Sequence, residues 1–212
     1  MVKCFISVSY AITVHNETFE IKRLLDTLIP LVDNNDEIIV LQDVTEESAE
    51  VTDILASYGN KIKKVRANLN GDFATFKNIL ITASSKKYLF QIDADEYPQK
   101  KLIRNLKWFL LKNYQSDCFA VPRINIVDGI TDEYLKKWNW KKDERNYINF
   151  PDFQQRLFKL NKRIAWKNKV HEELFGYKKI KPLPIENFDY CLVHPKVLKK
   201  QIYQNAFYDT MS

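Results

Sequence analysis

The sequence predicts an α/β fold in which a mostly parallel sheet is flanked by helices. Short apolar runs typical of buried strands alternate with amphipathic, helix-like segments of 10 to 17 residues, and two of the apolar runs end in carboxylates. The composition is that of an ordinary folded protein, with 45% hydrophobic residues, four Gly and seven Pro among 212 residues. This length suffices for one domain with its own apolar core.

The first half is expected to hold four strands separated by three helices. The expected strands cover residues 4–14, 37–42, 61–67 and 88–92. The first helix follows the cap Asn16-Glu17 and buries Leu24, Leu25, Leu28, Ile29 and Val32. The second runs from Thr45, as its cap, to Tyr58, and the third from Asp72, as its cap, to Ala83. Helices between consecutive strands predict a parallel sheet with ligands at its carboxyl edge.

The second half shows a looser order of elements. Pro98 suits the first turn of a helix that ends at Leu111, and residues 118–127 and 155–160 are expected to be strands. The charged, tryptophan-containing stretch 128–147 is expected to be a mobile loop, and residues 196–211 have the apolar spacing of a helix. We therefore expect one domain with a looser second half.

The charge is distributed unevenly between the two halves. Residues 1–98 hold 10 basic and 15 acidic side chains, whereas residues 99–212 hold 23 and 12. A basic half suits a phosphate-containing ligand, a nucleic acid or an anionic membrane surface, although simple solvation of the lysines is an equally good interpretation.

The cysteines and the apolar runs bear on the location of the protein. Cys4, Cys118 and Cys191 are far apart and form no CxxC pair, so neither a disulfide framework nor a thiolate zinc site is indicated. The longest apolar runs are shorter than a membrane span, and the N-terminal run has neither a basic flank nor a cleavage site. We expect a cytoplasmic location.

The strongest chemical signal is the strand Tyr88–Ile92, which ends in Asp93-Ala94-Asp95-Glu96. Three carboxylates in four residues repel one another unless a cation intervenes. Mg²⁺ or Mn²⁺ would neutralise them and would then hold a diphosphate. The alternative is a turn with solvated acids before Pro98.

Two other segments place polar groups at the same edge of the expected sheet. Asp43 follows the strand 37–42 and could accept hydrogen bonds from a nucleobase or ribose, although a helix cap is the simpler interpretation. Asn70-Gly71-Asp72-Phe73 precedes a helix that carries Lys77, which could reach phosphates. A turn and a cap explain that segment equally well.

Together these segments resemble the family 2 glycosyltransferases of GT-A fold, in particular compact soluble members similar to lipopolysaccharide-core glucosyltransferases. The resemblance rests on Ser9 to Glu17, Asp36-Glu37 with Asp43, Asn70 to Asn78, and Asp93 to Glu96. It implies that residues 1–98 form the nucleotide-sugar-binding half and residues 99–212 the acceptor-binding half of one GT-A domain. Lys77 stands where such members often have Arg, and Gln42 where many have Asp.

The resemblance also implies roles for particular residues. The nucleotide would be bound by the segments that contain Asn16, Glu17, Asp43, Asn70, Asp72 and Lys77, with Asp93 and Ala94 beside it. The metal would be held by Asp93 and Asp95. In the second half, Pro151 to Phe158, Trp166 and Val170-His171-Glu172 resemble the family's "RLF … W … VHE" stretch.

Inverting transfer requires a base that removes the proton of the acceptor hydroxyl. Glu172 is the first candidate and Asp152 the competitor; in the alternative interpretation Glu172 only pairs with Arg156 or a lysine. His171 and His194 could complete the coordination of the metal, and His15 could lie near the nucleotide, although a lone histidine is usually structural. Trp138, Trp140 and Tyr147 could stack on a sugar or simply pack.

The sequence thus predicts a metal-dependent inverting glycosyltransferase that uses a nucleotide-diphosphate sugar, with a UDP-sugar favoured. The expected acceptor is a glycan, a lipid-linked group or a protein hydroxyl, without nucleic acid and with peripheral membrane contact through the basic half. A sugar nucleotidyltransferase would normally begin with a Gly-rich phosphate loop, and Ser7 to Asn16 contains no Gly. A non-enzymatic binder of nucleic acid or anionic surfaces would leave Asp43 and the carboxylate cluster unexplained.

Overall fold

The computed structural model describes residues 6–211, with side chains described through residue 205. Within this part of the chain the strands form a nine-stranded sheet in the order β3-β2-β1-β4-β7-β6-β11-β5, with β10 paired to β6, and a separate two-stranded sheet, β8-β9. The strands are β1 Val8–Val14, β2 Glu37–Asp43, β3 Lys63–Ala67, β4 Tyr88–Asp93, β5 Tyr97–Pro98, β6 Cys118–Asp128, β7 Ile148–Lys159, β8 Ala165–Lys167, β9 Glu173–Phe175, β10 Ile180–Pro182 and β11 Leu192–Val197.

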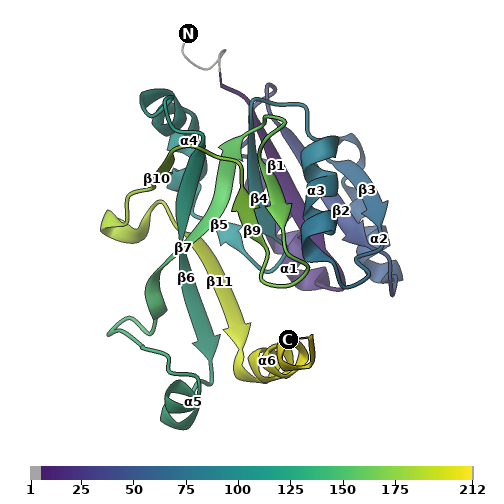
Figure 1. Cartoon of the computed structure of the whole chain (residues 1–212). Helices are drawn as coiled ribbons and strands as arrows, with labels where there is room; N and C mark the ends of the chain where they lie inside the picture. The colour runs from purple at the N-terminus through teal and green to yellow at the C-terminus, as the bar shows by residue number, and fades with distance from the viewer. Residues whose placement is uncertain (1–5, 212) are drawn as a thin grey trace.

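Helices cover both faces of the main sheet (Figure 1). They are α1 Thr18–Leu28, α2 Ala49–Ser57, α3 Phe73–Ala83, α4 Lys100–Lys112, α5 Asp132–Lys137 and α6 Leu198–Met211, with short 3-10 turns at η2 Gly59–Lys61 and η3 Glu186–Phe188. Buried side chains of α1, α2 and α4 form the larger core on one face, and α3 packs with β8 and β9 on the other. The mixed α/β architecture predicted from the sequence is confirmed.

The first four strands are parallel, as the alternation of strands and helices predicted. β1 pairs with β2 on one side and with β4 on the other, and β2 pairs with β3. In this register Thr13 lies opposite Asp93, so β1 and β4 end at the same edge of the sheet. Polar residues that follow these two strands are therefore neighbours.

The second half joins the sheet through an antiparallel strand that sequence periodicity did not predict at full length. The expected strand 155–160 is the end of β7, which is 12 residues long and lies between β4 and β6, antiparallel to both. Residues from both sides of position 98 therefore share one sheet. The length of β7 was underestimated because its first half alternates exposed and partly exposed residues and contains Pro151.

Several local expectations were wrong. Ser48, not Thr45, caps α2, and its side chain accepts a hydrogen bond from the Val51 amide. The Thr45 hydroxyl instead donates to Asp43. Pro98 belongs to β5 rather than to α4, which begins after Gln99.

Three further expectations concern helices. The stretch 128–147 contains α5, capped by the Thr131 hydroxyl. Helix α1 ends at Leu28, before Val32, and its cap Glu17 makes no capping bond with its side chain. The predicted C-terminal helix is present as α6. Two expectations lie outside the described residues: the side chains of Ala206 and Phe207, and the start of the strand expected at Cys4.

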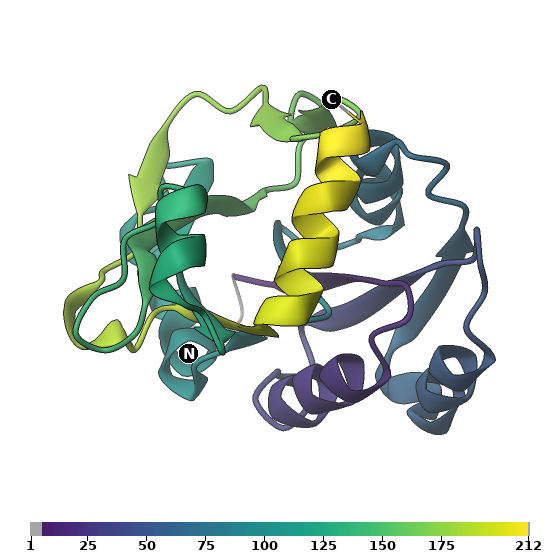
Figure 2. The same ribbon diagram turned by 90° about the horizontal axis from the view of Figure 1, so that it is seen from below.

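Helix α6 crosses the end of the molecule below the sheet, as Figure 2 shows, with α5 at the same end. Gln201 and Gln204 of α6 line the cavity described next. None of the helices in the described part of the chain is both long and apolar enough to cross a bilayer.

Candidate active site

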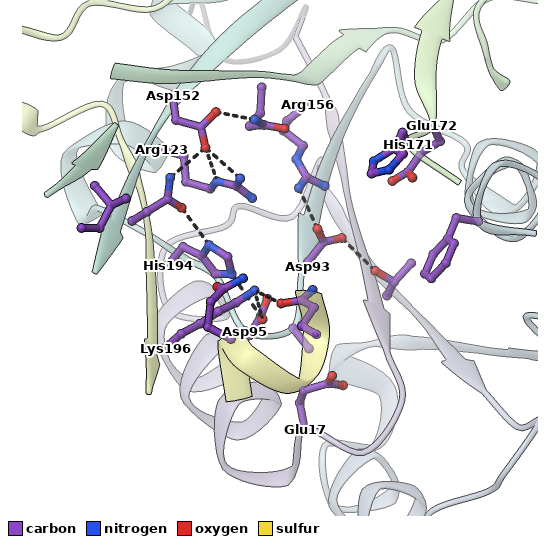
Figure 3. A pocket seen from close by; sticks show the side chains of 18 of the residues that line it. Glu17, Asp93, Asp95, Arg123, Asp152, Arg156, His171, Glu172, His194 and Lys196 are labelled. Carbon is purple, nitrogen blue, oxygen red and sulfur yellow. Dashed lines mark hydrogen bonds and ion pairs between the residues drawn. The ribbon is translucent and has the colours of Figure 1, made fainter. Parts of the chain in front are cut away.

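A cavity of about 740 Å³ lies where β1 and β4 end. Its walls bring together residues of both halves of the chain (Figure 3). The residues proposed from the sequence that line it are His15, Glu17, Lys77, Asp93, Ala94, Asp95, Trp140, Asp152, His171, Glu172 and His194. Asn16, Asp43, Asn70 and Asp72, also proposed from the sequence, are not among its lining residues.

Asp93, whose side chain is 28% exposed, is neutralised by basic side chains. Arg156 Nη2 lies 2.7 Å from its Oδ2, Thr13 donates to its Oδ1 at 3.0 Å, and Lys77 Nζ is 3.9 Å away. Burial alone would raise the pKa of Asp93, but the charges of Arg156 and Lys77 outweigh it and hold that pKa well below the ordinary value. Asp93 is therefore ionised and firmly oriented.

Glu96, the third carboxylate of the cluster, is fully buried and structural. It accepts hydrogen bonds from Arg123 at 3.0 Å, from Arg156 at 3.3 Å and from the Asp93 amide at 3.1 Å. Two arginines thus compensate the buried charge. This arrangement fixes the turn that presents Asp93 and Asp95 to the cavity.

Asp95 ends a chain of hydrogen bonds that starts at Asp152. Asp152 accepts from Asn125 Nδ2 at 2.9 Å, so Asn125 directs its Oδ1 to His194 Nδ1, also at 2.9 Å. Because Oδ1 only accepts, the proton of a neutral imidazole lies on Nδ1, and Nε2 faces Asp95 Oδ2 at 3.3 Å. Burial would raise the pKa of Asp95, but His194 and Lys196 reverse the effect and lower that pKa strongly.

The structure does not bring the predicted metal ligands Asp93, Asp95, His171 and His194 together in one cluster. Among the described residues, no three His, Cys, Asp or Glu side chains form a group of metal-site size. Figure 3 shows His171 beside Glu172, away from His194, because the loop after β8 carries it to another wall of the cavity. Asp95 and His194 are the two predicted ligands that lie side by side.

Glu172 lies across the cavity from the Asp95–His194 pair (Figure 3). Its Oε1 forms an ion pair with Lys77. Lys77 is 6% exposed and also lies 5.0 Å from the ring centre of Trp166. The pairing with a lysine that was the alternative interpretation is therefore present. Glu172 nevertheless lines the cavity, and no hydrogen bond from the described residues reaches its Oε2.

Asp152, the competing base, is more fully bonded. Arg123 and Asn125 donate to its Oδ2, and Gln154 donates to its Oδ1 at 2.5 Å. Burial would raise the pKa of Asp152, but Arg123 and these amide donors together hold that pKa below the ordinary value. A carboxylate so stabilised in its ionised form is a weak proton acceptor.

The residues proposed for the nucleotide are divided between the cavity and its supports. Asp72 caps α3 by accepting a hydrogen bond from the Thr75 amide, and Asn70 adopts a positive φ of 49° in the turn before it. Asp43 accepts hydrogen bonds from the amides of Thr45 and Leu69 and pairs with His15. His15 and Leu69 do line the cavity, so Asp43 lies behind its wall.

We expect Asp43→Asn to lower the free energy of unfolding by about 1.5–3 kcal/mol, the range for hydrogen bonds to a charged group. Burial would raise the pKa of Asp43, but its bonds to Thr45 and Leu69 prevail and lower it. A lowered carboxyl pKa stabilises the fold above the unfolded pKa, and this contribution disappears as the pH falls through the folded value. Urea denaturation of both proteins near pH 7 and near pH 3 measures the effect; an equal difference at both values would contradict the role of the charge.

Three residues that sequence patterns did not single out help to build the site: Arg123, Asn125 and Lys196. Lys196 Nζ lies 3.7 Å from Asp95 Oδ2. The only signal for Arg123 and Lys196 in the sequence was the basic surplus of the second half, and Asn125 had none. Part of that surplus compensates acids of the first half, because Arg123, Arg156 and Lys196 pair with Glu96, Asp93 and Asp95.

Comparison with known proteins identifies the class to which this fold and site belong. The family model described as "Glycosyl transferase family 2" matches residues 9–178. The chain belongs to this family.

Curated relatives match nearly the whole of this chain. Over 208 residues it is 24% identical to the SPbeta prophage-derived glycosyltransferase SunS of Bacillus subtilis strain 168 and to the glycosyltransferase SunS of Bacillus phage SPbeta. The match covers 95% of this chain but 40% of each relative, so the chain spans about two fifths of their length.

Solved structures show the same fold. S. aureus TarS 1–349, in a crystal structure with UDP-GlcNAc, superposes with a TM-score of 0.63 at 15% identity, covering 90% of this chain and 59% of that chain. A crystal structure of TarS 1–349 gives a TM-score of 0.60 at 14% identity, covering 94% and 63%. The GT-A-like fold expected from the sequence is confirmed.

Proposed function

We propose that the protein is a metal-dependent inverting glycosyltransferase that moves a sugar from a UDP-sugar to a hydroxyl group. One observation carries the proposal: the Asp95–His194 pair and the Glu172 carboxylate lie on different walls of one cavity. A donor diphosphate would lie beside the pair, and an acceptor hydroxyl beside Glu172. The UDP-GlcNAc complex of S. aureus TarS, which shares the fold, supports a UDP-sugar as donor.

The geometry of Asp95 and His194 fits a divalent cation. His194 Nε2 faces an oxygen of the ionised Asp95 carboxylate at 3.3 Å, an approach that either a proton on Nε2 or a cation beside the two atoms explains. Adjacent ligands of an octahedral ion with bonds of 2.0–2.1 Å lie about 3 Å apart. No described residue binds Asp95 Oδ1, so one carboxylate oxygen remains for a cation beside Lys196.

A bound Mg²⁺ or Mn²⁺ would supply positive charge that stabilises the departing diphosphate. Lys196 adds a fixed positive charge on the same side of the cavity. His15, Glu17, Leu69 and Phe73 form the wall on which the base and ribose would bind, held from behind by Asp43. Lys77 keeps Glu172 oriented.

Glu172 would take the proton from the acceptor hydroxyl. The hydroxyl oxygen then bonds to the anomeric carbon from the face opposite the leaving group, while the bond from that carbon to the diphosphate oxygen breaks and its electron pair leaves with UDP. This attack inverts the configuration of the sugar. Glu172 is preferred to Asp152 because no described donor blocks its Oε2.

Ligand-dependent stability tests the donor and the metal together. We expect UDP with Mn²⁺ to raise the free energy of unfolding by about 2.7 kcal/mol at one hundred times the dissociation constant, measured by chemical denaturation with and without ligand. In chelator this stabilisation should be smaller, because the positive charge of the cation beside Asp95 is then absent. Equal stabilisation in chelator would contradict the proposed metal dependence. If neither UDP nor GDP stabilises the protein, the proposed nucleotide-sugar donor is contradicted.

A further inference from the structure

A second cavity, of about 610 Å³, adjoins the first. The two cavities share Lys77, Phe153, Gln154, Arg156 and Glu172 among their lining residues. Glu172 therefore borders both spaces. A molecule in the second cavity would reach the proposed base without passing through the donor site.

The second cavity has aromatic walls. Phe153 of β7 and Phe175 of β9 are each 40% exposed, although large apolar side chains are usually covered. Trp166 of β8 and Tyr177, which follows β9, complete this group. Such rings offer flat faces that pack on an apolar surface of similar shape.

Hydrogen-bonding groups lie between these rings. Gln154, Gln155 and Glu172 supply carbonyl, amide and carboxylate groups, so the wall both donates and accepts. Tyr177 accepts a hydrogen bond from Gln155 Nε2 at 2.9 Å, which leaves its own hydroxyl proton for another partner. Arg156 is 5% exposed, and its Nε and Nη1 have no hydrogen-bond partner among the described residues.

We propose that this second cavity is the acceptor subsite and that it binds a saccharide whose attacking hydroxyl points to Glu172. A pyranose ring has the required surface, since its C–H faces suit the aromatic rings and its hydroxyls both donate and accept. The volume lies within the range of ordinary ligand sites. This inference rests on the proposed function because it takes Glu172 as the base.

Binding to arrayed ligands tests the proposal. The labelled protein, with UDP and Mn²⁺, is applied to an array of immobilised glycans and to an array of peptides containing Ser and Thr. We expect binding to glycans, and we expect Phe175→Ala and Phe153→Ala each to weaken it up to about 10-fold, the contribution of one aromatic contact. Phe153→Tyr keeps a ring and should retain binding, as should Trp108→Ala, which removes an exposed aromatic outside both cavities.

UDP binding with Mn²⁺, measured on each variant, separates this proposal from the proposed function. If the parent protein does not bind UDP, the proposed function fails. If the parent protein and both alanine variants bind UDP, the donor site is intact, and the glycan signal alone decides the second proposal. Any of three results would overturn the proposed acceptor subsite. The parent protein binds no glycan, both alanine variants bind glycans as the parent does, or the protein binds peptides instead of glycans.

Discussion

Glu172→Gln is expected to lower the rate of sugar transfer by about 10²- to 10⁴-fold, the usual contribution of general-base catalysis. Glutamine keeps the size of the side chain but cannot take the proton of the acceptor hydroxyl. UDP binding with Mn²⁺ should survive, because the Asp95–His194 pair lies on another wall of the cavity. Transfer is measured by release of UDP in the presence of acceptor, and binding by calorimetry.

Two further variants make this result specific. Asp152→Asn changes the competing carboxylate, and Glu186→Gln changes an exposed glutamate outside both cavities. Near-parental transfer by Glu172→Gln together with loss of transfer in Asp152→Asn would assign the base to Asp152. Because the change also removes the charge that faces buried Lys77, denaturation of each variant must show that the assay temperature lies below its unfolding transition.

Asp95→Asn is expected to abolish the part of UDP binding that depends on Mn²⁺. The stabilisation by UDP with metal, about 2.7 kcal/mol at one hundred times the dissociation constant, should fall to the value found in chelator. Asparagine cannot supply the negative charge that attracts a divalent cation, and it removes a charge that repels the diphosphate. Titration of UDP with and without Mn²⁺ measures both effects.

His194→Ala and Asp128→Asn complete this experiment. His194→Ala removes the second proposed ligand and should give the same loss, whereas Asp128→Asn changes an exposed carboxylate at the end of β6 and should behave as the parent protein. Metal-dependent binding that persists in both Asp95→Asn and His194→Ala would show that the cation binds elsewhere. The Asp95–His194 geometry would then be explained by a proton on Nε2.

The elements of the first half could be predicted from the sequence because their signals are local. β1, β2 and β4 are continuous buried runs, and α1 and α3 carry apolar residues at helical spacing. Parallel strands joined by helices end at one edge, so the position of Asp93 and Asp95 at that edge also followed from the pattern. Errors were confined to boundaries such as Thr45, where a hydroxyl that could cap a helix bonds to Asp43 instead.

The sequence by itself therefore determined the fold class, the parallel strand group and the carboxylate cluster at its edge. Tertiary structure alone decided which cations meet those carboxylates. Arg156 reaches Asp93 because β7 pairs with β4, and His194 reaches Asp95 because β11 lies beside β6. Hydrophobic periodicity indicates whether a residue is buried. An ion pair between residues more than sixty positions apart depends instead on strand pairing across the whole sheet, and no local sequence pattern encodes that pairing.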